Sequence, residues 1–309
     1  MTAMTSTSIN RSILEMEEIQ EILMVMRSNE SGFYHIKDYL ADKPAGKDVV
    51  DESWRQRMCE WMYGVVDHCN FRRDIVAVSA SYLDLVLTKE RTILYSRRTF
   101  QLTAMTCLYL AMKVYDTSFV KLESLIKLGR GLFTVDDVIQ MEDRILTQIF
   151  KWKLHPPTAM CFLRHYTRLF PSTLSPSISY MISEVSRFIA EISVCLYKFV
   201  KYRPSAIAMS ALIIAIDGID SSSLPSGPRK LILQRMKTIA KMDPNTPEMQ
   251  QLTRRLRASF EKNVDIRALM TTIDPNCVVG YNTNSPKTTK HRNVSSNDNG
   301  SPKDVTQAA

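Results

Sequence analysis

Apolar side chains cover nearly the whole circumference of one helix-length stretch, residues 100–116, FQLTAMTCLYLAMKVYD. Polar residues within it are few and small until Lys113. A helix that is apolar on all sides has no face for water, so it belongs inside a domain with other helices around it. The stretch spans roughly 25 Å as a helix, which is too short to cross a bilayer. The pattern therefore predicts a buried central helix.

The segments around this stretch have the apolar spacing of three and four that is typical of amphipathic helices. They are residues 52–68, 72–88 and 119–128, and a fourth segment that begins after Thr134. Asp51 and Thr134 are candidate N-caps, and Asp137 stands three residues after Thr134, as in a capping box. With the central stretch these segments predict five helices, of which the third is buried.

A second set of five segments follows the break at Pro156 and Pro157, at residues 158–169, 176–198, 204–219, 228–241 and 247–261. Proline lies at or near the start of four of them, where its fixed φ and missing N–H do no harm. The third segment, 204–219, is again apolar nearly all round. Sequence identity between the two sets is low, so the repeat is one of architecture. We predict an all-α fold of two five-helix domains in tandem, the third helix of each buried at the centre.

The two ends of the chain differ from this pattern. Residues 12–26 predict an amphipathic helix, whereas the Ser/Thr-rich residues 1–10 predict disorder. From residue 271 onward the chain is rich in Asn, Ser, Thr and Lys and predicts a disordered tail. The expected organisation is an N-terminal extension over 1–50, a first domain over 51–155, a second over 156–270 and the tail over 271–309.

Composition narrows the class of protein further. The six cysteines form no CxxC pair and predict reduced thiols. The N-terminal residues lack the apolar core of a signal peptide, and the longest mostly apolar run, 207–216, is shorter than a membrane span. We therefore expect a protein of the nucleus or cytoplasm without a membrane partner. The formal net charge of +8 suits nucleic acid, an acidic partner or neither.

No pattern of catalytic residues emerges from the sequence. There is no Gly-rich phosphate loop and no nucleophile beside a base, and the carboxylates lie mostly on faces predicted to meet solvent. Cys161 and His165, four residues apart, could form half a metal site, but no second pair is near them in sequence, so core packing is favoured. We expect no enzymatic activity, metal or cofactor.

Five short motifs, in order and at matching spacing, resemble the cyclin family. They are WRQRMCEWM at 54–62, YLDLVL at 82–87, FQL at 100–102 with LAMK at 110–113, the Met-Glu and Ile-Leu pairs at 141–146, and Trp-x-Leu with Pro-Thr and Phe-Leu at 152–163. The resemblance covers roughly residues 32–219 and is strongest over 54–163. Trp-Met at 61–62 and Cys-Leu-Tyr-Leu at 107–110 lean toward the D-type cyclins.

The resemblance implies a regulatory subunit that binds a cyclin-dependent protein kinase and holds its regulatory helix in the active position, controlling cell-cycle progression. Lys113 and Glu142 match residues that contact the kinase in that family. Without the resemblance, Lys113 would be interpreted as a cap on the last carbonyls of its own helix, and Glu142 as a solvated residue. Arg55 and Asp84 match a buried ion pair that braces the first domain.

The resemblance also implies a substrate-docking groove, but two of its positions carry residues that disfavour peptide binding. Its matching residues are Trp54, Met58, Trp61 and Gln101. In cyclins this groove takes Arg-x-Leu peptides, of substrates or of inhibitors, but here Arg57 replaces an aliphatic residue and Gly64 an acidic one. An added cation and a missing carboxylate both disfavour a basic peptide, so an intact Arg-x-Leu site is not expected.

Two alternatives share the same architecture. Paired five-helix domains also occur in DNA-binding transcription factors resembling the TFIIB family, and a positive net charge would suit DNA. The basic residues here are scattered and no zinc ribbon is present, so a nucleic-acid partner is not favoured. A cyclin-fold scaffold that has lost its kinase is the second alternative.

Overall fold

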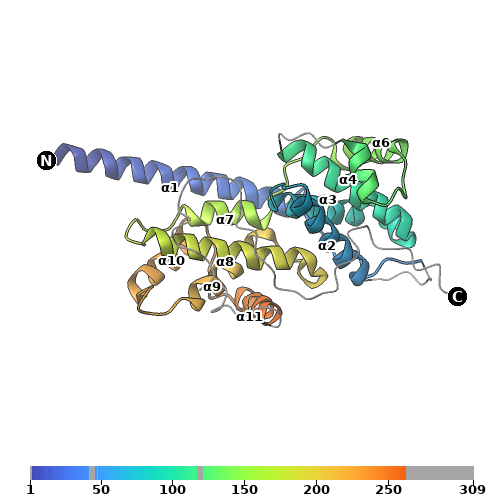
Figure 1. Ribbon diagram of the computed structural model, residues 1–309. Helices are drawn as coiled ribbons and strands as arrows, with labels where there is room; N and C mark the ends of the chain where they lie inside the picture. Colours follow the sequence, from blue (N-terminus) through green and yellow to red (C-terminus); the bar gives the residue numbers. More distant parts are fainter. Residues whose placement is uncertain (1, 42–45, 47, 117–120, 262–309) are drawn as a thin grey trace. The chain divides into compact units, whose positions relative to one another are not determined.

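The structure is a computed structural model that describes residues 2–41, 46, 48–116 and 121–261, with side chains from residue 14 onward. Over these residues it is helical with no β-strand (Figure 1). The prediction of an all-α fold with two five-helix sets is confirmed. The predicted tail at 271–309 lies outside the described residues.

The described chain divides into two compact units, and their membership differs from the predicted ranges. The N-terminal unit contains residues 36–156 together with 194–201, and the C-terminal unit contains 2–35, 157–193 and 202–261. The helix predicted as part of a separate extension therefore belongs to the C-terminal unit, because its apolar face packs there. Chain order alone does not reveal such an exchange of segments.

The N-terminal unit consists of five α-helices and three short helical turns. They are α2 (Glu52–His68), α3 (Asp74–Lys89), η1 (Arg91–Tyr95), α4 (Arg97–Tyr115), α5 (Leu122–Leu128), α6 (Val135–Arg144), η2 (Ile145–Phe150) and η3 (Tyr197–Phe199). Asp51 caps α2 by accepting the Trp54 N–H at 3.0 Å. The predicted capping box of α6 is present, since the Thr134 hydroxyl and the Asp137 carboxylate each accept the other residue's backbone N–H.

The predicted central helix is α4, which is buried from Phe100 to Met112 except at Leu102. It begins at Arg97, three residues before the predicted start, because the Ser96 hydroxyl caps it by accepting the Thr99 N–H at 3.2 Å. Its buried threonine hydroxyls are satisfied within the helix: Thr103 and Thr106 donate to carbonyls one turn earlier, each at 2.8 Å. Helix α4 therefore needs no polar face, and α3 and α6 pack against it.

A π-helical turn that the sequence pattern did not predict follows α6. Residues Ile145–Phe150 form this turn, η2, and the next two residues, Lys151 and Trp152, have left-handed φ angles of 48° and 63°. Such turns and angles are uncommon for residues with a side chain, and they cluster at functional sites.

The C-terminal unit consists of six α-helices, of which α1 comes from the N-terminal end of the chain. They are α1 (Thr2–Ser31), α7 (Ala159–Thr167), α8 (Pro176–Cys195), α9 (Pro204–Gly218), α10 (Ser226–Thr238) and α11 (Pro247–Glu261). Helix α9 is the buried centre, with α7 and α11 packed against it. Its buried Ser210 hydroxyl accepts a hydrogen bond from Thr253 of α11 at 3.1 Å.

Helix α1 is longer than predicted at both ends. Residues 2–10, predicted to be disordered, continue the helix, and no glycine or proline interrupts the stretch. Ile19 and Leu23 are buried, and α1 packs on α7 (Figure 1). Leu14, by contrast, is 64% exposed, although it lies on the predicted apolar stripe.

Two charged side chains fasten the C-terminal end of α1 to the ends of other helices. The Glu30 carboxylate, 2% exposed, accepts the Ser205 N–H at 2.9 Å and the Ser205 hydroxyl at 2.6 Å at the start of α9. The Arg27 guanidinium donates to the Ala240 and Lys241 carbonyls just beyond α10, at 3.4 and 3.1 Å. A helix carries partial positive charge at its N-terminus and partial negative charge at its C-terminus, so both contacts have the favourable sign.

Candidate functional site

The structure brings Lys113 and Glu142 together at the C-terminal end of α4. Lys113 Nζ lies 2.5 Å from Glu142 Oε1 of α6 and 5.0 Å from the centre of the Tyr109 ring. The Lys113 side chain is 47% exposed and that of Glu142 is 13% exposed. Lys113 therefore does not act only as a cap on the carbonyls of its own helix, because it forms an ion pair with a residue of α6.

Local packing of α6 explains the position of Glu142. The capping box at Thr134 fixes where the helix begins. Val138 and Met141 are buried, with Met141 Sδ 3.8 Å from the Thr103 hydroxyl of α4. Because Met141 faces α4, the next residue is turned to the edge of the contact, where it meets Lys113.

The segment after the π-turn, residues 151–155, contacts the same end of α4 through hydrogen bonds and ring contacts. Tyr115 donates a hydrogen bond to the Leu154 carbonyl at 3.2 Å, and its ring meets the His155 ring edge-on at 5.6 Å. The Tyr82 hydroxyl donates to the same carbonyl. Leu154 and His155 are therefore held against Tyr115, which follows Lys113 by two residues.

Two large apolar side chains are exposed on the segments that contact α4 near this end. Trp152 is 66% exposed, and Ile139, one turn before Glu142 on α6, is 50% exposed. We call Lys113, Ile139, Glu142 and Trp152 the α4-end surface. In the sequence, Trp152 stands out only as part of a motif. Its flanking residues, Lys151 and Lys153, are the signal that this aromatic side chain meets solvent.

Arg55 and Asp84 form a doubly hydrogen-bonded ion pair inside the N-terminal unit. Nε and one Nη of Arg55 each lie 2.7 Å from a carboxylate oxygen of Asp84, and the two side chains are 2% and 6% exposed. The Tyr39 hydroxyl donates to Asp84 at 2.7 Å, and Arg55 also donates to the Val194 carbonyl at 2.8 Å.

The partners of this pair extend it into a buried network. Burial, followed by the Asp84 charge, raises the pKa of Tyr39, so Tyr39 stays a hydrogen-bond donor. Burial raises the pKa of the Cys59 thiol to about 11, so this cysteine is an unreactive core residue. The local sequence does not indicate these roles, because Tyr39 lies 45 residues from Asp84 and Val194 lies 139 residues from Arg55.

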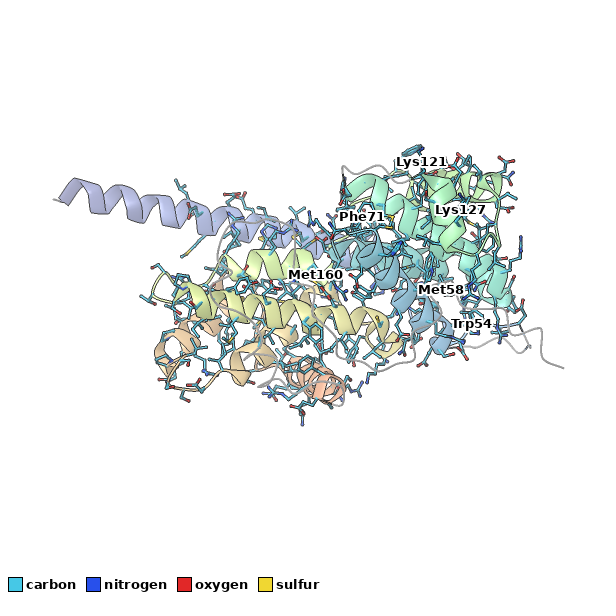
Figure 2. All side chains as sticks on the ribbon, viewed as in Figure 1. Trp54, Met58, Phe71, Lys121, Lys127 and Met160 are labelled. Carbon is cyan, nitrogen blue, oxygen red and sulfur yellow. The ribbon has the colours of Figure 1, made fainter. Side chains whose placement is uncertain are left out.

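The four residues implied for a docking groove are all buried. Trp54, Met58, Trp61 and Gln101 are 2%, 0%, 7% and 3% exposed. Figure 2 labels the first two, which both belong to α2. The guanidinium groups of Arg57 and Arg97 lie over the Trp54 ring, 4.5 and 4.9 Å from its centre. Two cations therefore cover the indole. That basic peptides are disfavoured here stays a prediction.

Neither a candidate metal cluster nor a candidate membrane span is found among the described residues. Within them, no cluster of three His, Cys, Asp or Glu side chains could hold a metal, so Cys161 and His165 gain no further ligand there. In the same part of the chain, no helix is both long enough and apolar enough to cross a membrane.

The fold defines a class of protein built from two five-helix domains, in each of which the third helix is buried. The cyclin N-terminal domain model matches residues 21–155, and the cyclin C-terminal domain model matches residues 157–297. This chain belongs to the cyclin family.

Curated relatives are A- and B-type cyclins of plants. Cyclin-A2-3 of Arabidopsis thaliana is 28% identical over 183 residues, which cover 59% of this chain and 39% of that protein. Cyclin-B2-2 of Oryza sativa subsp. indica is 24% identical over 210 residues, covering 68% of this chain and 47% of that protein. The matches thus span less than half the length of these two relatives. They do not support the lean toward D-type cyclins.

A solved structure has the same fold. The viral cyclin from herpesvirus saimiri superposes with a TM-score of 0.55 at 15% sequence identity, covering 80% of this chain and 98% of that one. At this identity the likeness speaks for the fold alone.

Proposed function

We propose that this chain is a regulatory subunit that binds and activates a cyclin-dependent protein kinase, and that it carries no catalytic activity itself. Membership of the cyclin family supports this proposal, and the observation that carries it is the α4-end surface. The kinase's mobile regulatory helix would rest on this surface in its active position. There the kinase completes the Lys–Glu ion pair and magnesium site that phosphoryl transfer requires.

The chemistry of the α4-end surface suits this role. Lys113 Nζ can donate to carbonyl oxygens of a partner, while the second oxygen of Glu142 can accept from an amide. Trp152 and Ile139 provide the apolar contact, and an exposed tryptophan is a frequent centre of binding energy. Because α4 is buried and fixed, the surface needs little rearrangement before binding, which lowers the entropic cost.

The test is co-expression with candidate cyclin-dependent kinases, followed by pull-down and phosphorylation of histone by the captured complex. Lys113→Ala and Glu142→Ala should each weaken kinase binding about tenfold, as expected for one lost charge-assisted hydrogen bond. Lys127→Ala and Asp143→Ala are matched controls, since they remove the same charges from exposed positions outside the surface. The Lys113–Glu142 pair is partly exposed, so its loss should cost folding no more than about 1 kcal/mol.

Two results would contradict the proposal. A correctly folded chain that captures no kinase would indicate a cyclin-fold scaffold. A chain that captures no kinase but retains duplex DNA at 200 mM salt would indicate a DNA-binding factor. The proposal also assigns the chain to cell-cycle control in the nucleus, the cytoplasm or both, which imaging of a fluorescently tagged chain through the cell cycle would test.

A further inference from the structure

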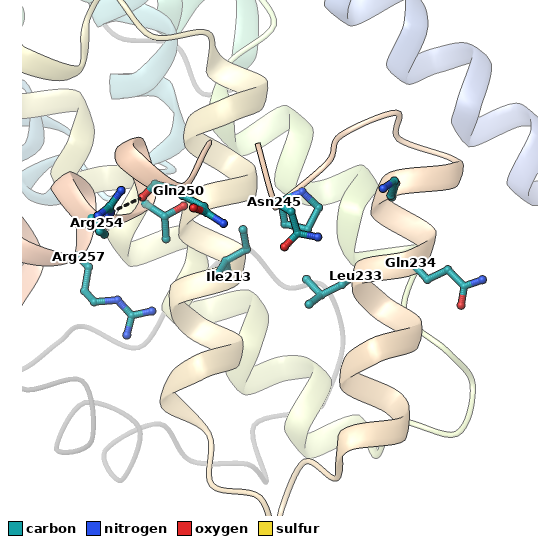
Figure 3. Close-up of a pocket in the computed structure, with 10 residues that line it drawn as sticks. Ile213, Leu233, Gln234, Asn245, Gln250, Arg254 and Arg257 are labelled. Carbon is teal, nitrogen blue, oxygen red and sulfur yellow. Dashed lines mark hydrogen bonds between the residues drawn. The ribbon is translucent and has the colours of Figure 1, made fainter. Parts of the chain in front are cut away.

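A groove lies among α9, α10 and α11 of the C-terminal unit (Figure 3). Its volume is about 660 Å³, within the range of sites that hold ligands. Apolar side chains form its floor: Ile213 of α9, Leu233 of α10 and Pro244 of the connection before α11. Ile213 is only half-buried, whereas its neighbours Leu212 and Ile214 are fully buried.

The rim of the groove is cationic and rich in amides. Lys237 comes from α10, Arg254 and Arg257 come from α11, and among the described residues no Asp or Glu lines the groove. Gln234, Asn245 and Gln250 add amide groups that can donate or accept hydrogen bonds. An anionic ligand with an apolar portion would therefore be complementary to both the rim and the floor.

The three cations are not equally available to a ligand. Lys237 pairs with Asp243 at 2.7 Å, and Arg257 pairs with Asp217 at 2.6 Å. Arg254 donates only its Nε, to the Gln250 carbonyl at 3.3 Å, and pairs with no carboxylate of the described residues. The N–H groups on its two Nη atoms remain available to donate to a ligand. Arg254 is therefore the cation that a ligand can bind without displacing a partner.

The surroundings strengthen the positive charge of this groove. Residues 226–261, which form α10, α11 and their connection, contain eight Lys and Arg residues against three Asp and Glu residues. An excess of one sign over a local surface attracts and orients the opposite charge before contact. This argues for an acidic partner over a neutral apolar one.

We propose that the groove between α10 and α11 binds an acidic peptide segment of a partner protein, with one apolar side chain of the peptide seated on Ile213, Leu233 and Pro244. The acidic side chains on either side of it pair with Arg254 and, in part, with Arg257 and Lys237. The inference uses none of the residues of the α4-end surface and stands independently of kinase binding. A peptide fits better than a nucleic acid because the cations surround an apolar floor and two of them are already paired.

The proposal is tested by probing the full chain with an array of short acidic peptides, each with one central Leu, Ile, Phe or Met. The tightest peptide is then measured by fluorescence anisotropy. Arg254→Gln should weaken its binding about fivefold, the upper end of what a partly exposed ion pair contributes. Replacing the apolar residue of the peptide by serine should weaken binding about tenfold or more, because its burial on the floor is lost.

Arg255→Gln is the matched control. Arg255 is the next residue on α11, carries the same charge and binds the Tyr202 hydroxyl at 2.8 Å away from the groove. This substitution should change peptide affinity less than twofold, while both variants keep the circular dichroism spectrum of the wild type. The proposal is overturned if no peptide of the array binds, if the two substitutions weaken binding equally, or if duplex DNA displaces the peptide and binds with the same dependence on Arg254.

Discussion

Glu30 offers the sharpest test of how α1 is joined to the C-terminal unit. Its carboxylate holds both the N–H and the hydroxyl of Ser205, and Ser205 is itself 1% exposed. Substituting Glu30→Ala leaves that N–H buried without an acceptor, which costs about 1–3 kcal/mol. Removing the negative charge from the N-terminus of α9 adds at most about 1 kcal/mol. We expect the free energy of unfolding to fall by about 1–4 kcal/mol in total.

The measurement is urea unfolding followed by circular dichroism, with hydrogen exchange of residues 202–212 as the local readout. All three tryptophans lie in the N-terminal unit, so tryptophan emission reports on that unit separately. Glu21→Ala is the control, since Glu21 is exposed on the same helix and its loss should change stability by no more than about 0.5 kcal/mol. Unchanged exchange at the start of α9 in Glu30→Ala would refute the capping role.

The pH dependence of Glu30 tests which physical effect dominates. Burial raises the pKa of Glu30 above its ordinary value of 4.5, although the hydrogen bonds from Ser205 and the charges of Arg203 and Arg27 lower it. As pH rises above about 4.5, the unfolded chain loses this proton before the folded chain does, so stability is lost until the folded-state pKa is passed.

Glu30→Gln cannot ionise, so comparison with it isolates this effect. The stability advantage of the wild type over Glu30→Gln should be largest below about pH 4.5 and should shrink as pH rises through the raised folded-state pKa. An advantage that grows with pH over the same range would mean that the helix dipole and the hydrogen bonds outweigh burial, and would refute this reasoning.

Three further substitutions probe other elements. Asp84→Ala leaves Arg55 charged and buried, so the free energy of unfolding in urea should fall by about 3–5 kcal/mol. The double variant Arg55→Met/Asp84→Leu should recover most of this stability. A single variant as stable as the wild type would contradict the burial of the pair. Trp152→Ala should change stability by less than about 0.5 kcal/mol because the side chain is exposed, yet weaken kinase capture more than about tenfold in a pull-down titration; equal capture would remove it from the interface. Ser96→Ala should cost about 1 kcal/mol in thermal unfolding through loss of the α4 cap, whereas no loss would show that the Thr99 N–H finds another acceptor.

Several features of the site were predictable because they depend on local sequence. The capping box at Thr134 and the apolar circumference of α4 follow from residues within one or two turns. The family motifs pointed to Lys113 with Glu142 and to Arg55 with Asp84, and the structure holds each pair in contact. The kinase role of the first pair stays a prediction.

The parts that escaped prediction depend on contacts between distant residues. The π-turn after α6 and the left-handed backbone of Lys151 leave no periodic pattern in the sequence. The segment that follows them is held by hydrogen bonds from Tyr82 and Tyr115, which belong to other helices. The residues around Glu30 give no signal of its partner, because Ser205 lies 175 residues away along the chain.

The sequence by itself determined the all-α class, the number of helices in each five-helix set and the two helices that must be buried, because hydrophobic periodicity and helix caps act within a few turns. Only the tertiary structure decided which surface α1 covers, that residues 194–201 join the N-terminal unit, and that Ile139 and Trp152 stay exposed on segments that contact α4. An apolar stripe requires some apolar partner, but its residues do not specify which one. That choice depends on the shape and hydrogen-bonding groups that distant segments present once they have folded.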